Sequence, residues 1–183
     1  MLHPAIFLDR DGVIIENCPN YVRTWEDVQL FEQALTALVK IKRSPYKIVI
    51  VTNQSAIGRG LITLAQAHAI NARLVKTIVD AGGRVDGVYL CPHQPADQCT
   101  CRKPQPGLLQ QAAQDLRLDV GRSFMIGDAL SDLLAGKLAG VQKVALVRTG
   151  RGSAQVQLPV PQELGDFSVY ETLEEALTHL VPG

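Results

Sequence analysis

The sequence has no excess of charge of either sign. Its 183 residues contain 18 Lys and Arg against 18 Asp and Glu, so the formal net charge is +0. A chain without a net field does not attract nucleic acid or an anionic membrane over its whole surface. It also lacks an apolar run of membrane-crossing length, and it opens on Met1-Leu2-His3-Pro4, without the basic and apolar regions of a secretory signal. We therefore expect a cytoplasmic protein that binds neither nucleic acid nor a membrane.

Internal repeats and low-complexity tracts are absent as well. The chain is long enough to bury a sizeable core, but it is short for two domains of the usual size. We expect residues 1–183 to form one domain, and we expect that domain to be a monomer.

Cysteine is scarce, and only Cys18 of the four cysteines stands apart from the others. The other three form, with a histidine, one cluster of potential zinc ligands: Cys91, His93, Cys99 and Cys101. Three thiolates and an imidazole complete the tetrahedral coordination of Zn²⁺ and leave no position for substrate, which indicates a structural metal. A disulfide or free thiols are the alternatives, but three bunched thiols cannot all pair among themselves, and the spacing favours a metal. Zinc here would hold in place the two cationic residues that follow, Arg102 and Lys103.

Short apolar runs alternate with helical patterns along the chain. The predicted strands are residues 5–8, 47–52, 85–90, 123–127 and 143–147. The predicted helices are residues 32–42, 106–116, 131–139 and 172–180, together with one that Thr63 opens and that Gly82 and Gly83 end. Capping boxes are expected at Thr63 with Gln66 and at Thr172 with Glu175. Strands that are apolar on both faces are typical of parallel sheets covered by helices. We expect a Rossmann-like α/β domain with a mostly parallel sheet between two helical layers, and a surface excursion at residues 150–165.

Acidic or phosphate-binding side chains follow three of these strands. The first strand leads to Asp9 and Asp11, which face the same way because residues i and i+2 of an extended chain do. Such a pair suits acid/base chemistry, covalent attack or cation binding, although Asp-Gly is also common in solvated turns. The second leads to Thr52-Asn53-Gln54-Ser55, whose side chains can donate hydrogen bonds to phosphoryl oxygens, and the fourth leads to Asp128 and Asp132. Asp132 alone could simply favour a helix N-terminus, but together these groups are expected at the edge where this fold binds ligands.

The residues match the motifs of a known superfamily. Asp9-Arg10-Asp11-Gly12, Thr52-Asn53, Lys103, and Gly127-Asp128 with Asp132 resemble, in this order, the four motifs of the haloacid dehalogenase superfamily of aspartate-nucleophile phosphotransferases. The cysteine and histidine block before Arg102-Lys103-Pro104 resembles its zinc-bearing branch, which holds D-glycero-D-manno-heptose 1,7-bisphosphate 7-phosphatase and histidinol-phosphate phosphatase.

The resemblance implies a Mg²⁺-dependent phosphomonoesterase. In such an enzyme Asp9 attacks phosphorus and forms an aspartyl-phosphate, while Asp11 protonates the leaving alcohol and then deprotonates water. Mg²⁺ would be held by Asp9, Asp128 and the backbone carbonyl of Asp11, and a phosphate oxygen and waters would complete an octahedron.

The remaining motif residues would serve the phosphoryl group and the substrate. Thr52 and Lys103 would hold the phosphoryl oxygens, and Asp132 would orient Lys103 or a metal-bound water. The candidates for substrate contact are Asn53, Gln54, Ser55 and Arg102.

The expected substrate is a small phosphorylated sugar. The segment between the first acidic motif and the first helix is too short for a cap domain, so residues 17–21 and the zinc loop should cover an open site. Heptose 1,7-bisphosphate, hydrolysed at the 7-position, is the first expectation and histidinol phosphate the second. The branch commonly has a basic residue where this chain has Ala129, which weakens the choice of substrate more than the choice of reaction.

A different class of function uses similar groups. A non-enzymatic phosphoaspartate switch, or a zinc-stabilised interaction module, would also combine an α/β sheet with strand-end carboxylates. Asp11 favours the enzyme, because an acid/base two residues after the nucleophile speeds hydrolysis of the phosphorylated form that a switch must preserve.

Overall fold

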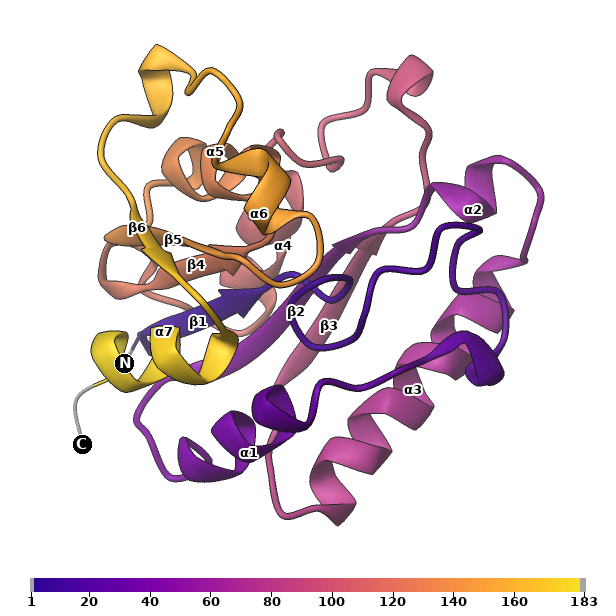
Figure 1. Cartoon of the computed structure of the whole chain (residues 1–183), viewed down its shortest axis with the longest axis horizontal. Coiled ribbons are helices and arrows are strands. Elements are labelled where there is room, and N and C mark those ends of the chain that lie inside the picture. Colours follow the sequence, from indigo (N-terminus) through magenta and orange to yellow (C-terminus); the bar gives the residue numbers. More distant parts are fainter. Residues whose placement is uncertain (1, 182–183) are drawn as a thin grey trace.

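The computed structural model describes residues 2–181 and is built on one six-stranded sheet (Figure 1). The strands are β1 (Ala5–Leu8), β2 (Lys47–Asn53), β3 (Gly87–Cys91), β4 (Phe124–Gly127), β5 (Lys143–Val147) and β6 (Ser168–Tyr170). Their order is β3-β2-β1-β4-β5-β6, and every pairing is parallel. The expected parallel α/β sheet is confirmed.

Helices cover both faces of the sheet. They are α1 (Glu32–Lys40), α2 (Ser55–Gly58), α3 (Leu64–Asp80), α4 (Gly107–Asp115), α5 (Leu130–Ala139), α6 (Gly152–Gln155) and α7 (Leu173–Leu180). In Figure 1, α1, α3 and α7 lie on one side of the sheet and α4 and α5 on the other. Successive side chains of a strand point to opposite faces, so Ile6 and Leu8 join the first core while Ala5 and Phe7 join the second. This double burial explains why the strands are apolar on both sides.

The two expected capping boxes have different outcomes. At α3, Thr63 Oγ1 accepts from Gln66 N–H at 3.1 Å and Gln66 Oε1 accepts from Thr63 N–H at 2.7 Å, as predicted. At α7, Thr172 Oγ1 accepts from Glu175 N–H at 3.2 Å, but the Glu175 carboxylate accepts from the N–H of Glu171 instead. The reciprocal half of the second box is therefore wrong, because the carboxylate reaches one residue further back.

The expected surface excursion at residues 150–165 is only partly correct. Its middle, residues 157–160, is exposed. Its start contains α6 with a buried Gly152, and near its end Leu164 is fully buried in the second core. The segment then leads into β6, a strand that the sequence analysis missed.

The strand order creates a natural binding crevice. The chain runs from β1 outward through β2 and β3, then crosses to β4 on the other side of β1. At such a switch point the connections leave in opposite directions and open a crevice at the carboxyl ends of the two central strands. Between β1 and α1 the described residues form only loops, isolated bridges and the short 3-10 helix η1 (Trp25–Asp27), so no cap domain covers this edge. No helix in residues 2–181 is both long and apolar enough to span a membrane.

Candidate active site

Three buried carboxylates converge at the switch point. Asp9 follows β1, Asp128 follows β4, and Asp132 lies in the first turn of α5. Each brings one oxygen into a group whose members all lie within 4.8 Å of one another, and their side chains are almost inaccessible. Asp132 also accepts a hydrogen bond from the N–H of Ala129 at 3.0 Å, so the helix start fixes its direction. Anionic groups packed this closely need cations for compensation.

The environment favours the neutral form of Asp9. Burial is the largest cause that raises the pKa of Asp9 above its ordinary value, because a charged carboxylate loses its hydration there. Asp132 and Asp128 raise it further by like-charge repulsion, whereas Lys103 opposes them. A cation beside Asp9 would therefore favour the ionised carboxylate that a nucleophile requires.

Lys103 supplies one such cation. Its ammonium lies 2.8 Å from Asp9 Oδ1 and 2.8 Å from Asp132 Oδ1, and it donates to the carbonyl oxygen of Val51 at 2.8 Å. Burial alone would lower the pKa of Lys103, but Asp132 and Asp9 raise it on balance, so the side chain is an ammonium. With three acceptors for three protons, the group is fixed in direction.

Asn53 anchors the backbone of the same lysine. Its side-chain Nδ2 donates to Lys103 O at 3.0 Å, and its Oδ1 accepts from Lys103 N–H at 3.1 Å. These two bonds join the end of β2 to the loop before α4. Asn53 was expected to contact substrate; it lines the cavity described below, and its amide also holds Lys103.

Asp11 stands beside the carboxylate group in a different set of contacts. Arg10, which is buried, donates to both Asp11 oxygens through Nε at 3.0 Å and Nη2 at 3.1 Å. Gln54 Nε2 donates to Asp11 Oδ2 at 3.1 Å and to Thr52 Oγ1 at 2.8 Å. Thr52 Oγ1 in turn lies 3.4 Å from Asp11 Oδ2. No role was expected for Arg10, which holds Asp11. Gln54, expected to contact substrate, lines the cavity described below and also holds Asp11.

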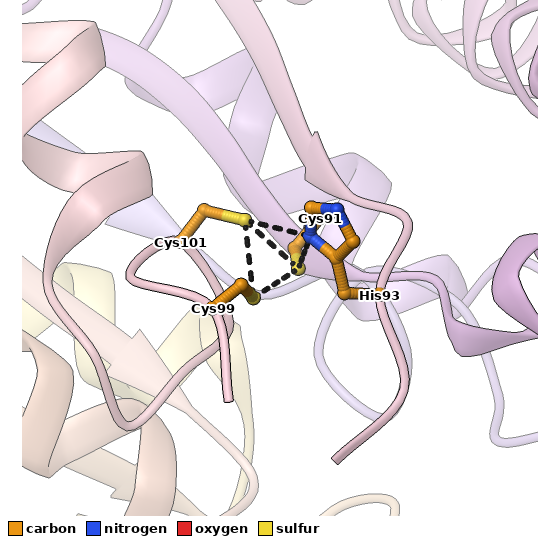
Figure 2. Close-up of side chains that lie close together, drawn as sticks. All are labelled: Cys91, His93, Cys99 and Cys101. Atoms are coloured by element: carbon orange, nitrogen blue, oxygen red, sulfur yellow. Dashed lines mark hydrogen bonds between the residues drawn. The ribbon is translucent and has the colours of Figure 1, made fainter. Parts of the chain in front are cut away.

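The cysteine and histidine cluster has the size of a zinc site (Figure 2). Cys91 ends β3, and its Sγ lies 3.6 Å from His93 Nδ1, 3.6 Å from Cys99 Sγ and 3.1 Å from Cys101 Sγ. A tetrahedron with Zn–S bonds of about 2.3 Å has edges of about 3.8 Å, close to these separations, whereas a disulfide needs sulfurs at about 2.05 Å. Burial alone raises the pKa of the Cys99 thiol, but hydrogen bonds from Arg102 N–H and the neighbouring thiols lower it on balance, whereas burial raises the pKa of the Cys91 and Cys101 thiols. The match to a zinc site therefore depends on the donor types and their separations. The donor set therefore fits a structural Zn²⁺.

A cavity of about 680 Å³ opens above the carboxylates. It is lined by Asp9, Asp11, Asn17, Cys18, Pro19, Tyr21, Val22, Asn53, Gln54, Ser55, Arg59, Pro95, Arg102, Lys103, Ser131, Asp132 and Arg151. The lining includes most of the expected residues 17–21 and three residues of the zinc loop, Pro95, Arg102 and Lys103. Five motif residues, Asp9, Asp11, Asn53, Lys103 and Asp132, thus line one cavity together with Arg59, Arg102 and Arg151, whereas Thr52 and Asp128 are buried behind it.

Comparison with known proteins shows which family this chain belongs to. Residues 100–176 match the HAD-hydrolase-like family. The D-glycero-β-D-manno-heptose-1,7-bisphosphate 7-phosphatase of Photorhabdus laumondii is 41% identical over 81% of this chain and 82% of the relative. The corresponding enzyme of Pseudomonas aeruginosa is 35% identical over 88% of this chain and 90% of the relative. The chain belongs to this haloacid dehalogenase-like family of phosphatases.

A solved structure of a relative contains a bound magnesium ion. The D,D-heptose 1,7-bisphosphate phosphatase of B. bronchiseptica, complexed with magnesium and phosphate, superimposes with a TM-score of 0.88 at 32% identity and covers 97% of both chains. In the present chain Asp9 and Asp128 offer the buried carboxylate oxygens that Mg²⁺ prefers, and Asp9 also lines the cavity. The residues present therefore fit a magnesium ion.

Two functional contacts of this HAD-like site were missed by the sequence analysis. Arg151 donates to Asp128 Oδ1 through Nη2 at 3.0 Å and to Oδ2 through its backbone N–H at 2.8 Å, and Asn17 Nδ2 donates to Oδ2 at 2.8 Å. The hydrogen bonds and charge of Asp128 raise the pKa of Arg151. The available signal was the run Thr149-Gly150-Arg151-Gly152, which begins two residues after the end of β5, since the other site loops also follow strand ends.

Proposed function

We propose that this family member is a Mg²⁺-dependent phosphomonoesterase that forms an aspartyl-phosphate on Asp9 and releases the 7-phosphate of D-glycero-D-manno-heptose 1,7-bisphosphate. The observation that carries this proposal is the position of Asp9. Its carboxylate is ion-paired with Lys103 at 2.8 Å, grouped with Asp128 and Asp132, and lines a cavity large enough for a sugar phosphate.

In the first step an oxygen of Asp9 bonds to phosphorus while the bond from phosphorus to the sugar oxygen breaks. Asp11 donates its proton to that departing oxygen, so the sugar leaves as an alcohol. In this proposal the ammonium of Lys103 and the hydroxyl of Thr52 stabilise the phosphoryl oxygens as charge moves onto them. The contacts of Asp11 with Arg10 and Gln54 fix the direction of its carboxyl group beside the cavity.

In the second step water attacks the phosphorus of the aspartyl-phosphate. Asp11, now a carboxylate, takes a proton from that water, and the bond between phosphorus and Asp9 breaks. Inorganic phosphate leaves, and both carboxyl groups return to their starting states. The same residue thus acts as acid and then as base.

Asp9, Asp128 and the backbone carbonyl of Asp11 would hold the Mg²⁺, which neutralises charge between the anionic nucleophile and the anionic phosphate. We assign Zn²⁺ to Cys91, His93, Cys99 and Cys101, with the role of holding the loop that carries Arg102 and Lys103. Asn53 and the Lys103 ion pairs fasten the other end of that loop to the site.

The proposed substrate is supported by the relatives named above and by the shape of the site. The cavity has no cap domain over it within residues 2–181, and three arginines line it, as a sugar with two phosphates requires. We retain Asn53, Gln54, Ser55 and Arg102 as candidates for substrate contact. A panel of both anomers of heptose 1,7-bisphosphate and histidinol phosphate, compared by kcat/KM, tests the choice; a higher value for histidinol phosphate would reassign the substrate within the same chemistry.

The reaction itself is tested with p-nitrophenyl phosphate and Mg²⁺. We expect turnover by the natural protein, none by Asp9→Asn, and slow turnover with an accumulating phosphoenzyme for Asp11→Asn. Circular dichroism of each variant checks that the fold is retained. A natural protein that does not turn over but keeps a persistent phosphoenzyme would support the phosphoaspartate switch instead.

We further propose that residues 1–183 act as one domain, as a monomer, in the cytoplasm. A reducing compartment keeps the three thiols available to zinc. Light scattering gives the oligomeric state, and a single cooperative unfolding transition is expected of one domain.

A further inference from the structure

Arg151 holds Asp128 from the cavity side. Its Nη2 donates to Oδ1 at 3.0 Å and its Nε lies 3.3 Å from Oδ2, so the guanidinium covers both oxygens of the carboxylate. The Asp128 side chain is 0% exposed, whereas the Arg151 side chain is 56% exposed. The carboxylate is therefore fixed inside the protein, and the cation that covers it faces the cavity.

Only the side chain of Arg151 is free to leave. Its backbone N–H donates to Asp128 Oδ2 at 2.8 Å, and Thr149 Oγ1 donates to Gly12 O at 2.6 Å. Gly150, with a φ of +60°, packs so closely that a Cβ there would lie 2.5 Å from Asp128 Oδ2. Asn17 Nδ2 also holds Oδ2, so Asp128 keeps two donors when the guanidinium moves away.

The guanidinium and a magnesium ion need the same carboxylate. A divalent cation between Asp9 and Asp128 would use an oxygen that Arg151 now covers, and like charges this close repel strongly in a buried site. The exposed side of Arg151 opens into the cavity that Arg59 and Arg102 also line. Within residues 2–181 neither Arg59 nor Arg102 forms an ion pair with a carboxylate, so both charges are available to an anion that enters the cavity.

We propose that Arg151 is the counter-ion of Asp128 until Mg²⁺ binds, and that Mg²⁺ then displaces its guanidinium into the cavity, where it binds the non-reacting phosphate of the substrate. This inference rests on the function proposed above and deepens it. Metal binding and recognition of the second phosphate are thereby coupled through one side chain, which also makes a basic residue at Ala129 unnecessary.

The first test measures Mg²⁺ binding alone. Isothermal titration of Mg²⁺ into protein dialysed free of it, with no substrate present, is compared for the natural protein and Arg151→Met. Because the variant lacks the competing cation, we expect its Kd for Mg²⁺ to fall by roughly fivefold. Arg148→Met is the matched control, since Arg148 belongs to the same loop but pairs with Glu171 at 3.0 Å, and its Kd should not change. An Arg151→Met Kd that is unchanged or weaker than natural overturns the proposal.

The second test measures how Arg151 affects the KM for substrate at saturating Mg²⁺. For Arg151→Met we expect the KM for the heptose bisphosphate to rise by about tenfold. The increase should be several-fold smaller for the sugar 7-phosphate that lacks the second phosphate, and Arg151→Lys should recover part of the loss. Equal effects on the two substrates overturn the proposed contact. If no phosphomonoester is hydrolysed by the natural protein, the proposed function fails, while the Mg²⁺ titration still decides the competition.

Discussion

Lys103 shows how much of this site depends on a single charge. It is the ammonium that both Asp9 and Asp132 contact at 2.8 Å, and all three side chains are nearly inaccessible. A buried ion pair is weak evidence for net stability, because desolvation offsets the attraction. Removing one partner is different, since the charges left behind have neither water nor a counter-ion.

We therefore predict that Lys103→Met lowers the free energy of unfolding by about 3–5 kcal/mol and slows turnover by at least about 100-fold. Urea denaturation and steady-state kinetics measure the two effects. Lys47→Met is the control: Lys47 pairs with Asp86 at 3.0 Å but is 36% exposed, so its loss should cost no more than about 1 kcal/mol.

A double variant separates stability from chemistry at the same position. Lys103→Met combined with Asp132→Asn removes one of the two stranded charges, so it should recover part of the lost stability while turnover stays low. Recovery of turnover would show that Lys103 serves the fold and not the phosphoryl group.

At the scale of elements, the zinc loop positions Lys103, and so affects the proposed reaction. It runs from Cys91 at the end of β3 to Lys103 before α4, and within it the four donors lie 3.1–3.6 Å apart along their measured edges. The loop has little core of its own, so a metal would supply the free energy that orders it. Its last residue is nevertheless tied down independently, by the amide of Asn53.

We predict that Cys101→Ser lowers bound zinc below one equivalent and reduces turnover without abolishing it, because Asn53 still holds the backbone of Lys103. Metal analysis and kcat measurements test both parts. Cys18→Ser should keep its full zinc content, since Cys18 lies outside the cluster. One full equivalent of zinc in the Cys101 variant would contradict the tetrahedral assignment.

Most of the strands could be predicted from the sequence, but not all of them. Four strands were predicted to within one residue at each end, because parallel strands buried on both faces form continuous apolar runs. The run at residues 85–90 becomes β3 at Gly87–Cys91, shifted toward the zinc cluster. Three-residue β6 was missed because so short an edge strand carries no period.

Side-chain partners were harder to predict than strand ends. The motif residues could be placed because parallel strands end at a common edge. The roles of Arg151 and Asn17 depend on how the loop after β5 packs against Gly12, which is a contact between distant segments. Gln54 lines the cavity as a substrate contact would, but its hydrogen bonds to Asp11 and Thr52 depend on its rotamer, which the sequence does not give.

At the scale of the whole molecule, the cluster of Asp9, Asp128 and Asp132 couples Mg²⁺ binding to the stability of the folded protein and to its pH dependence. The unfolded chain protonates Asp9 near its ordinary pKa of 3.8, whereas burial and neighbouring carboxylates raise that pKa in the folded protein. Between the pKa of Asp9 in the unfolded chain and its raised pKa in the folded protein, the folded protein binds the proton more tightly than the unfolded chain does. Without Mg²⁺, Asp9 therefore makes the free energy of unfolding fall as pH rises through this range. Mg²⁺ favours the ionised carboxylates and should reverse the trend.

We predict that Mg²⁺ at about 100 times its Kd raises the Tm by about 5–10 °C at a pH of about 8, and by less at a pH of about 5, where protons compete for Asp9. Thermal melts monitored by circular dichroism, with and without Mg²⁺, measure the difference. Asp128→Asn should abolish the Mg²⁺ effect, while Asp80→Asn should retain it, because Asp80 pairs with Lys76 on the exposed side of α3. A Tm shift that is equal at both pH values, or that survives in Asp128→Asn, would mean that the stabilising cation binds elsewhere on the molecule. Mg²⁺ would then not be the reason that Asp9 is ionised.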